Sequence, residues 1–154
     1  PTLEDDGTIV WESHSIIRYL TEKFGAETHW WPNSLENRAH AGQWMDWYSS
    51  RLNMPMTTIF WNVVRHPPDK RDPDAVISAT KEAELLWTIL DAELSQNKFL
   101  GGEAPSISDI PVGCAIHRWS AMDFKKSSFP NVEAWYTRLS ERHAYQQNVM
   151  LPLS

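Results

Sequence analysis

Glu12 and Ser13 are the adjacent pair whose types and position best suit ligand binding. They stand between a β-branched and aromatic run, Thr8–Trp11, and the start of a helical pattern. A carboxylate accepts hydrogen bonds from an amine, whereas a hydroxyl and the free N–H groups of a helix N-terminus suit a carboxylate. The pair is therefore a candidate anchor for a ligand that carries both groups. The dipeptide alone favours a plainer alternative, in which the serine caps a helix after a surface glutamate.

A second group of candidates combines aromatic side chains with arginines on one expected long helix. An arginine among aromatic rings can bind a carboxylated substrate or stabilise a thiolate. The alternative is that the rings pack in the core and the guanidinium groups are solvated. The candidates are Trp47, Tyr48, Arg51, Trp61 and Arg65.

The other residue types that often do chemistry carry weaker signals. Cys114 is the one cysteine, and we expect it to be a small buried core residue because no paired histidine is near it in sequence. His117 and Arg118 are expected to be structural. The six histidines show no metal-ligand spacing, so no metal site is expected.

The elements that would position the first pair form a strand, a turn, a strand and a helix. The Asp-Asp-Gly sequence at 5–7 predicts a turn between strands at 2–3 and 8–11. Apolar residues at 16, 17, 20 and 24 then have helical spacing. Gly25 is expected to cap that helix at its C-terminus.

Helices separated by breaks are predicted for the rest of the chain. Residues 26–33 are expected to be a linker, in which Trp30 and Trp31 pack at a junction rather than bind a ligand. A long helix from about 35 to 64 follows the N-cap Ser34, and Pro55 should kink or break it near 51–53. Further helices are expected at 73–95, around 132–139 and at 144–150.

A capping box is predicted at the start of another helix, residues 107–122. The Ser106 hydroxyl should accept from the Asp109 N–H, and the Asp109 carboxylate should accept from the Ser106 N–H. This arrangement satisfies the unpaired donors of a buried helix N-terminus. Its role is folding, not catalysis.

These motifs together resemble the cytosolic glutathione S-transferases, and the final part is similar to a bacterial branch of that family. The opening proline, acidic-Gly turn and Glu-Ser pair resemble the last ββα of their thioredoxin-like domain, and the capping box lies where their helical domain has one. The resemblance covers all 154 residues. It implies a mainly α fold with the end of the thioredoxin-like domain at 1–25, the linker at 26–33 and an all-helical domain at 34–154.

The resemblance also implies a function and a site. Glu12 and Ser13 would bind the γ-glutamyl end of the co-substrate glutathione, and Pro1 matches the family's cis-proline. The long helix would line the pocket for a small, for example halogenated, electrophile that the glutathione thiolate attacks. The thiol-activating residue is expected before residue 1. The alternative function is a non-catalytic module of the same fold, used for binding or protein association.

The amino-acid composition limits the classes of molecule that the protein is expected to bind. A net charge of −6 and a pI near 5.4 argue against nucleic acid, which prefers a basic face. No apolar run approaches the length of a membrane span. A single cysteine fits a reducing cytoplasm. The family resemblance implies a homodimer, with His14, Arg18, Arg38 and Met45 as candidate interface residues.

Overall fold

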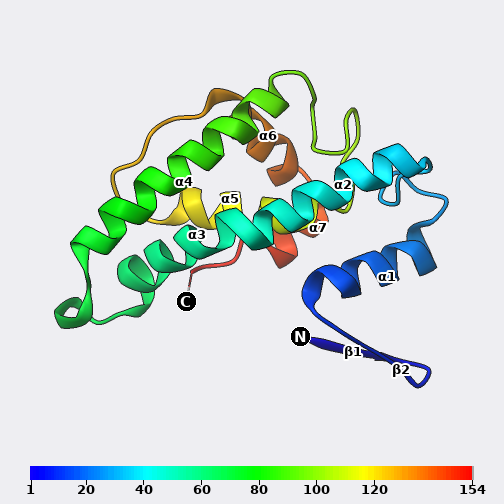
Figure 1. Ribbon diagram of the computed structural model, residues 1–154, viewed down its shortest axis with the longest axis horizontal. Coiled ribbons are helices and arrows are strands. Elements are labelled where there is room, and N and C mark those ends of the chain that lie inside the picture. Colours follow the sequence, from blue (N-terminus) through cyan, green and yellow to red (C-terminus); the bar gives the residue numbers. More distant parts are fainter. Residues whose placement is uncertain (154) are drawn as a thin grey trace.

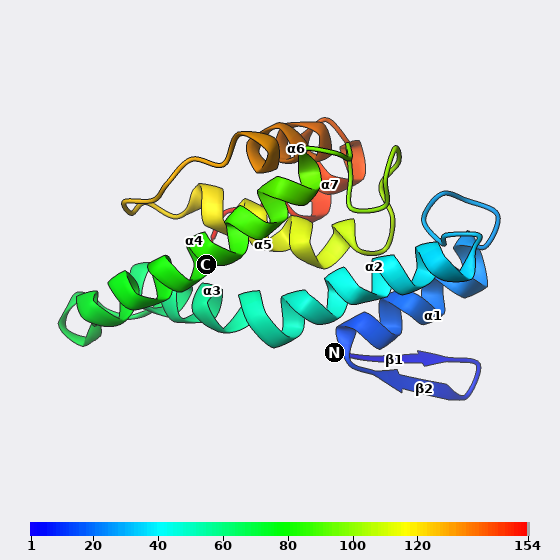
Figure 2. The same ribbon diagram turned by 45° about the horizontal axis from the view of Figure 1, so that its top comes forward.

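The computed structural model describes residues 1–153 and is mostly helical (Figure 1). The mainly α fold predicted from the sequence is confirmed. In chain order the elements are β1 (Thr2–Asp5), β2 (Thr8–Trp11), α1 (Ser13–Gly25), α2 (Leu35–Trp47), η1 (Tyr48–Leu52), α3 (Asn53–Phe60), η2 (Trp61–Arg65), η3 (Pro68–Lys70), α4 (Pro73–Leu94), α5 (Asp109–Ala121), α6 (Pro130–Ser140) and α7 (His143–Asn148). The hairpin and α1 lie below α2, and α6 and α7 lie on the opposite side of the molecule (Figure 2).

The N-terminal hairpin has the turn that its sequence predicts. β1 and β2 pair antiparallel, with Thr2 opposite Trp11. Asp6 and Gly7 both have positive φ, 50° and 83°, as a two-residue type I′ turn requires. The first strand reaches Asp5, two residues beyond the predicted end, because the turn needs only these two residues.

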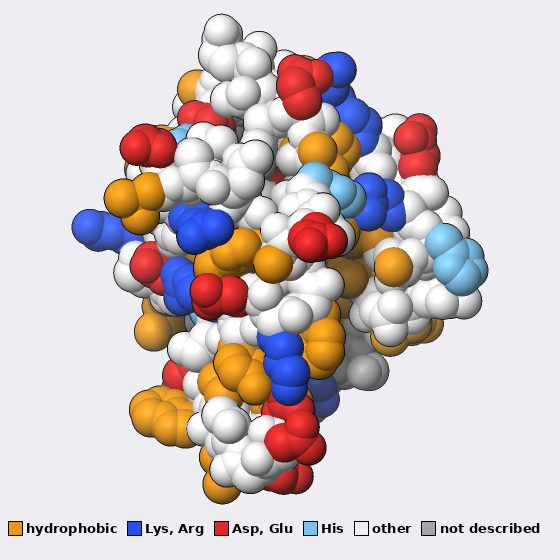
Figure 3. Space-filling view, turned by 90° about the vertical axis from the view of Figure 1, so that its right-hand side faces the viewer, with side chains coloured by type: hydrophobic (Ala, Val, Ile, Leu, Met, Phe, Trp, Pro, Cys, Tyr) orange, Lys and Arg blue, Asp and Glu red, His pale blue; other side chains and the backbone are white. Residues whose placement is uncertain are grey.

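The hairpin is fastened to α1 by polar contacts at Asp5. Its carboxylate accepts a hydrogen bond from the Tyr19 hydroxyl at 2.8 Å and pairs with the Lys23 ammonium. The hydrogen bond from Lys23 is the main cause that lowers the pKa of Asp5. A two-stranded sheet has little stability by itself, so these contacts help to fix the entry into α1. Figure 3 views this end of the molecule, where charged side chains of both signs are interspersed with apolar ones.

The predicted role of Gly25 is wrong in detail. It is the last residue of α1, without the positive φ of a left-handed cap. It is buried, and a Cβ there would lie 3.2 Å from Thr21 Cγ2 and 3.3 Å from Thr28 Oγ1. Glycine is therefore suited to this site by the close approach of the following loop, which local sequence does not reveal.

The junction between α1 and the helices that follow is packed by Trp31. Trp31 and Ile17 of α1 both pack against a small buried core formed by Ala41, Met45 and Ile107. Trp30 is half-buried, and its carbonyl accepts from the Ile107 N–H at 3.2 Å. These are the packing contacts predicted for the tryptophan pair.

The long helix is interrupted by two π turns. Ser34 caps its start by accepting from the Asn37 N–H at 3.2 Å, as predicted. Pro55 has no N–H to donate to the Arg51 carbonyl, and the break predicted near 51–53 takes the form of the π segment η1. The second π segment, η2, ends where the His66 N–H donates to the Trp61 carbonyl at 2.7 Å. No sequence signal predicted this second one.

The main core lies between the long helix and α4, α5 and α6. Trp87 and Trp135 are fully buried in it. Asp72 caps α4 by accepting from the Ala75 N–H at 3.0 Å, with Pro73 in the first turn as predicted. Most of the aromatic side chains pack in or against this core.

The start of α5 departs from the predicted capping box. The helix begins at Asp109 rather than 107. The Asp109 carboxylate accepts from the Ser106 N–H at 2.8 Å, but the Asp109 N–H donates to the Ser106 carbonyl rather than to its hydroxyl. The Ser106 hydroxyl instead contacts that of Ser108 at 2.7 Å. A turn at 107–108 precedes the helix. The Ser106 hydroxyl and the Asp109 N–H therefore do not form the second hydrogen bond of a capping box.

Asp109 also connects segments that are distant in sequence. Besides Ser106, its carboxylate accepts from the Leu100 N–H and from Trp135 Nε1, both at 2.9 Å. The residue is 2% exposed. Burial raises its pKa, and the surrounding hydrogen bonds oppose that shift.

Two glycines should respond in opposite ways to the same substitution. A Cβ on Gly101 would lie 2.7 Å from the Ala104 carbonyl oxygen and from Ser106 Cβ, so Gly101→Ala must displace the loop before α5. We expect it to lower the free energy of unfolding by about 1–3 kcal/mol. Gly42 lies inside α2 and its nearest neighbour is Arg18 Nη2 at 3.8 Å. Gly42→Ala should raise stability by about 0.5–1 kcal/mol, through helix propensity.

Urea denaturation followed by circular dichroism measures both changes. Equal effects of the two substitutions would contradict the close packing inferred at Gly101.

Candidate functional site

The strand-to-helix junction places Glu12 in an unusual backbone conformation. Its φ is 69° and its ψ is 125°, a region that residues other than glycine seldom occupy. Such strain persists where surrounding contacts or function maintain it. Both Glu12 and Ser13 are exposed, and no side chain caps the first turn of α1. The junction thus presents a carboxylate, a hydroxyl and helix N–H groups to solvent.

Pro1 lies beside this junction by strand register. Thr2 is paired with Trp11, so Pro1 and Glu12 each adjoin the last pair of the two strands. The match of Pro1 to the family's cis-proline stays a prediction.

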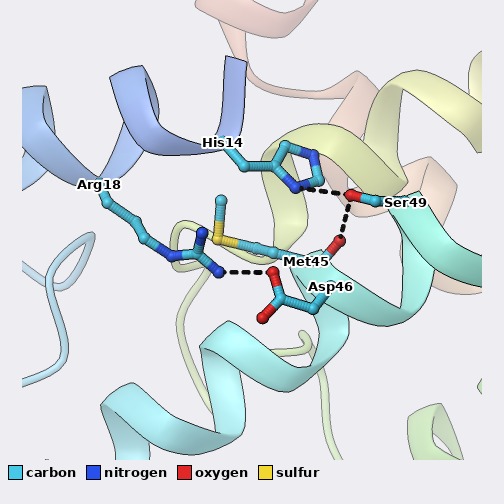
Figure 4. A network of polar contacts seen from close by, with 5 residues as sticks. All are labelled: His14, Arg18, Met45, Asp46 and Ser49. Carbon is cyan, nitrogen blue, oxygen red and sulfur yellow. Dashed lines mark hydrogen bonds and ion pairs between the residues drawn. The ribbon is translucent and has the colours of Figure 1, made fainter. Parts of the chain in front are cut away.

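The first turns of α1 are joined to the long helix by the network in Figure 4. His14 Nδ1 lies 3.0 Å from the Ser49 hydroxyl, which donates to the Met45 carbonyl at 3.2 Å. Arg18 forms an ion pair with Asp46 at 2.8 Å. Burial and the nearby Arg18 charge lower the pKa of His14. The neutral imidazole is favoured, and its Nδ1–H donates because the single hydroxyl proton of Ser49 is already used.

The residues predicted to lie in a dimer interface make contacts within the chain itself. Met45 is fully buried by the chain's own residues, so its prediction as an interface residue is wrong. His14 and Arg18 make the contacts just described. Arg38 donates to the Pro32 carbonyl at 2.6 Å, and its guanidinium lies 5.1 Å from the Trp31 ring centroid.

Four of the five predicted electrophile-pocket residues lie in the two π turns. Tyr48 and Arg51 belong to η1, and Trp61 and Arg65 belong to η2. π turns inside helices are common at functional sites. Trp47 is half-buried, and its ring packs edge-on against Trp44 with centroids 5.1 Å apart.

The structure does not gather these five side chains into one pocket. Tyr48 is half-buried, its ring centroid is 5.8 Å from that of His14, and burial raises its pKa. Trp61 is 48% exposed, and Arg51 is also exposed. Arg65 alone among the five lines a cavity of about 270 Å³, shared with α5 and the C-terminal tail.

That cavity contains residues expected to be structural. Cys114, His117 and Arg118 of α5 line it together with Phe60 and Arg65. Cys114 is half-buried and lines the cavity, rather than being the fully buried core residue that was predicted, and burial raises the pKa of its thiol. Phe60 and Arg65 lie near Cys114, His117 and Arg118 because of how α5 crosses the long helix. The spacing of these residues in the sequence does not predict that crossing.

A larger cavity, about 660 Å³, lies between α4 and residues 123–127 and contains none of the predicted site residues. Within residues 1–153, no group of three or more His, Cys, Asp or Glu side chains is arranged to hold a metal ion. In the same part of the chain, no helix has the length and apolar character needed to cross a membrane.

Comparison with known proteins identifies the family. The model of the glutathione S-transferase C-terminal domain matches residues 52–143, more than half of the chain. The chain belongs to the glutathione S-transferase family. This confirms the resemblance drawn from the Glu-Ser motif and from the start of α5.

The chain matches about three quarters of the length of two similar proteins. Glutathione S-transferase GstB of Escherichia coli K12 is 36% identical over 156 residues, which cover all of this chain and 74% of GstB. The crystal structure of a theta class glutathione S-transferase from Xanthomonas axonopodis pv. citri with glutathione bound superposes with a TM-score of 0.95. Its identity is also 36%, covering all of this chain and 73% of that one.

A more distant relative is the dichloromethane dehalogenase of Methylophilus leisingeri. It is 29% identical over 150 residues, which cover 92% of this chain and 56% of that enzyme.

Proposed function

We propose that this protein is a glutathione transferase in which Glu12 and Ser13 bind the γ-glutamyl end of glutathione. The observation that carries the proposal is the strained Glu12 at an uncapped helix N-terminus. Its carboxylate accepts from the α-amine of the tripeptide, and the Ser13 hydroxyl and the α1 N–H groups donate to the α-carboxylate. The partial positive charge of the helix N-terminus strengthens the second interaction. Pro1, which comes directly before β1, is proposed to border the same ligand.

The reaction is attack by the glutathione thiolate on a small electrophile. With a halogenated substrate, a carbon–sulfur bond forms, the carbon–halogen bond breaks, and the halide leaves with the bonding electron pair. The thiol proton is released before the attack. The relative named a dichloromethane dehalogenase supports this substrate class. Arg65, which lines the cavity beside α5, is proposed to border the electrophile. Trp47, Tyr48, Arg51 and Trp61 lie on the same long helix, and their part in the electrophile site stays a prediction because the structure does not gather them into one pocket.

Ser13→Ala is the experiment that tests the anchor. The substitution removes the hydroxyl from the proposed carboxylate site and leaves the backbone donors in place. We expect the affinity for S-methylglutathione, measured by isothermal titration calorimetry, to fall about 5- to 10-fold, the effect of one hydrogen bond.

Ser15→Ala is the matched control, since Ser15 lies in the same turn of α1 and is also exposed. It should bind as the wild type does. Equal affinity of Ser13→Ala and wild type would refute the assignment of Ser13.

The alternative of a non-catalytic binding module is less favoured because the relative at 36% identity is named as a transferase. We further propose that the enzyme is cytoplasmic, forms a dimer and detoxifies electrophiles. This proposal is supported by the single, unpaired Cys114 and by the family. Size-exclusion chromatography with light scattering would test the dimer, and a monomer would remove that part.

A further inference from the structure

The cavity between η2, α5 and the C-terminal tail carries an unbalanced positive charge. Arg65 and Arg118 both line it, and no aspartate or glutamate does. Neither guanidinium has an ion pair or a hydrogen bond within residues 1–153. We propose that this cavity binds the anionic group of a carboxylate-bearing aromatic electrophile. The inference rests on the proposed function and names its substrate class.

The two guanidinium groups lie against the same aromatic ring, that of Phe60. The carbon of the Arg65 guanidinium lies 5.6 Å from the Phe60 ring centroid, and that of Arg118 lies 5.4 Å from it. Each contact is a cation–π attraction of modest strength. Two cations around one ring repel each other, and an anion between or beside them removes that repulsion. Guanidinium forks also match the planar geometry of a carboxylate.

No aspartate or glutamate among residues 1–153 lines the cavity to fill that role. Cys114 lines the cavity as well, and burial raises the pKa of its thiol, so it stays a neutral thiol near pH 7. His117 is 8% exposed, with Nδ1 3.0 Å from the Tyr136 hydroxyl and Nε2 3.2 Å from the Leu151 carbonyl oxygen. A carbonyl only accepts, so Nε2 carries a proton. His117 therefore adds no negative charge.

The same histidine helps to form the cavity wall. Its bond to Leu151 ties the C-terminal tail to α5, and Val149, Leu151 and Leu153 of the tail line the cavity. The site thus combines an apolar wall with two cations. A volume of about 270 Å³ lies just below the range typical of drug-sized ligands, and suits a molecule the size of a substituted benzoate.

Tyr48 links this cavity to the proposed glutathione anchor. Its ring lies 5.8 Å from that of His14, the residue after Ser13. Burial raises the pKa of the Tyr48 hydroxyl, and the positive charge of Arg118 opposes that shift. A carboxylate held by the two arginines does not react. The thiolate attacks the ring carbon that bears the halogen, the new carbon–sulfur bond forms, and the halide leaves with the electron pair of the broken bond.

Isothermal titration calorimetry with a pair of unreactive probes tests the proposal. The probes, 3,5-dinitrobenzoate and 3,5-dinitrobenzamide, have nearly the same shape and differ in charge, and neither carries a leaving group. We expect the wild type to bind the benzoate about 10-fold or more tightly than the amide, the effect of one charged hydrogen bond or more. Arg65→Gln and Arg118→Gln should each remove most of this preference and leave the affinity for the amide unchanged.

Lys70→Gln is the matched control for overall charge. Lys70 is exposed, lies in η3 and does not line the cavity, so its loss should leave the preference for the benzoate intact. Equal affinity of the wild type for both probes, or binding of neither, would overturn the anion site. An undiminished preference in both arginine variants would also overturn it.

S-Methylglutathione titrated into the same proteins separates the two proposals. If the wild type binds it but shows no preference for the benzoate, the anion site fails and the proposed function stands. If the wild type prefers the benzoate but does not bind S-methylglutathione, the proposed function fails and the cavity is an anion site of another kind.

Discussion

Asp109→Ala is expected to lower the free energy of unfolding by about 3–5 kcal/mol. The change leaves three buried donors without their acceptor: the N–H groups of Leu100 and Ser106 and the indole N–H of Trp135. An unsatisfied buried donor costs about 1–3 kcal/mol. Two of the donors, on Leu100 and Ser106, belong to the loop before α5 and the third belongs to α6, so contacts of both segments are lost together.

Asp91→Ala is the matched control. The Asp91 carboxylate also accepts three hydrogen bonds, from the Asn131 N–H and Nδ2 and from the Val132 N–H, at 2.8–3.0 Å. It is only half-buried, so water can replace the lost acceptor. The expected cost is about 1 kcal/mol, as for the loss of a helix cap.

Urea denaturation monitored by tryptophan fluorescence compares the two variants with the wild type. If Asp109→Ala does not accumulate as folded protein, Asp109→Asn provides a graded alternative, because its amide oxygen still accepts while its NH₂ faces a donor. A cost for Asp109→Ala no larger than that for Asp91→Ala would show that burial does not determine the strength of this junction.

Glu12→Gln is expected to weaken the binding of S-methylglutathione about 10- to 100-fold with little effect on stability. The glutamine keeps the size and an acceptor oxygen, but it loses the negative charge that attracts the α-amine. A charged hydrogen bond contributes about 1.5–3 kcal/mol, which corresponds to that range of affinity. The side chain is exposed, so the fold does not depend on its charge.

Glu12→Gly separates binding from strain at the same position. Glycine adopts a φ of 69° without penalty, so relief of the strain should raise the free energy of unfolding by about 1 kcal/mol. The same variant lacks the carboxylate and should bind S-methylglutathione at least as poorly as Glu12→Gln. A variant that is more stable yet binds less well indicates that the strained glutamate serves the ligand rather than the fold.

Thermal unfolding and calorimetry on the two Glu12 variants provide both readouts. Glu4→Gln is a suitable control, because Glu4 is exposed in the same hairpin and its contact is with the Gly7 N–H of the turn. Wild-type affinity in Glu12→Gln would remove Glu12 from the proposed site. A loss of stability in Glu12→Gly would contradict the inference of strain.

The sequence by itself determined the features that depend on residues a few positions apart. The Asp6–Gly7 turn, the N-caps Ser34 and Asp72 and the helix break caused by Pro55 were all predictable, because each involves a backbone preference or a hydrogen bond within one turn. The Glu12–Ser13 junction was found in the same way, although its positive φ was not, since that conformation is unusual for glutamate.

Tertiary structure decided the features that depend on segments meeting from distant parts of the chain. The burial of Met45, the close approach at Gly25 and the donors to Asp109 from Leu100 and Trp135 arise only when helices pack. The cavity with Arg65 and Arg118 is of the same kind. Side chains 53 positions apart in sequence share the Phe60 ring because α5 packs against the long helix, and no local pattern encodes that crossing.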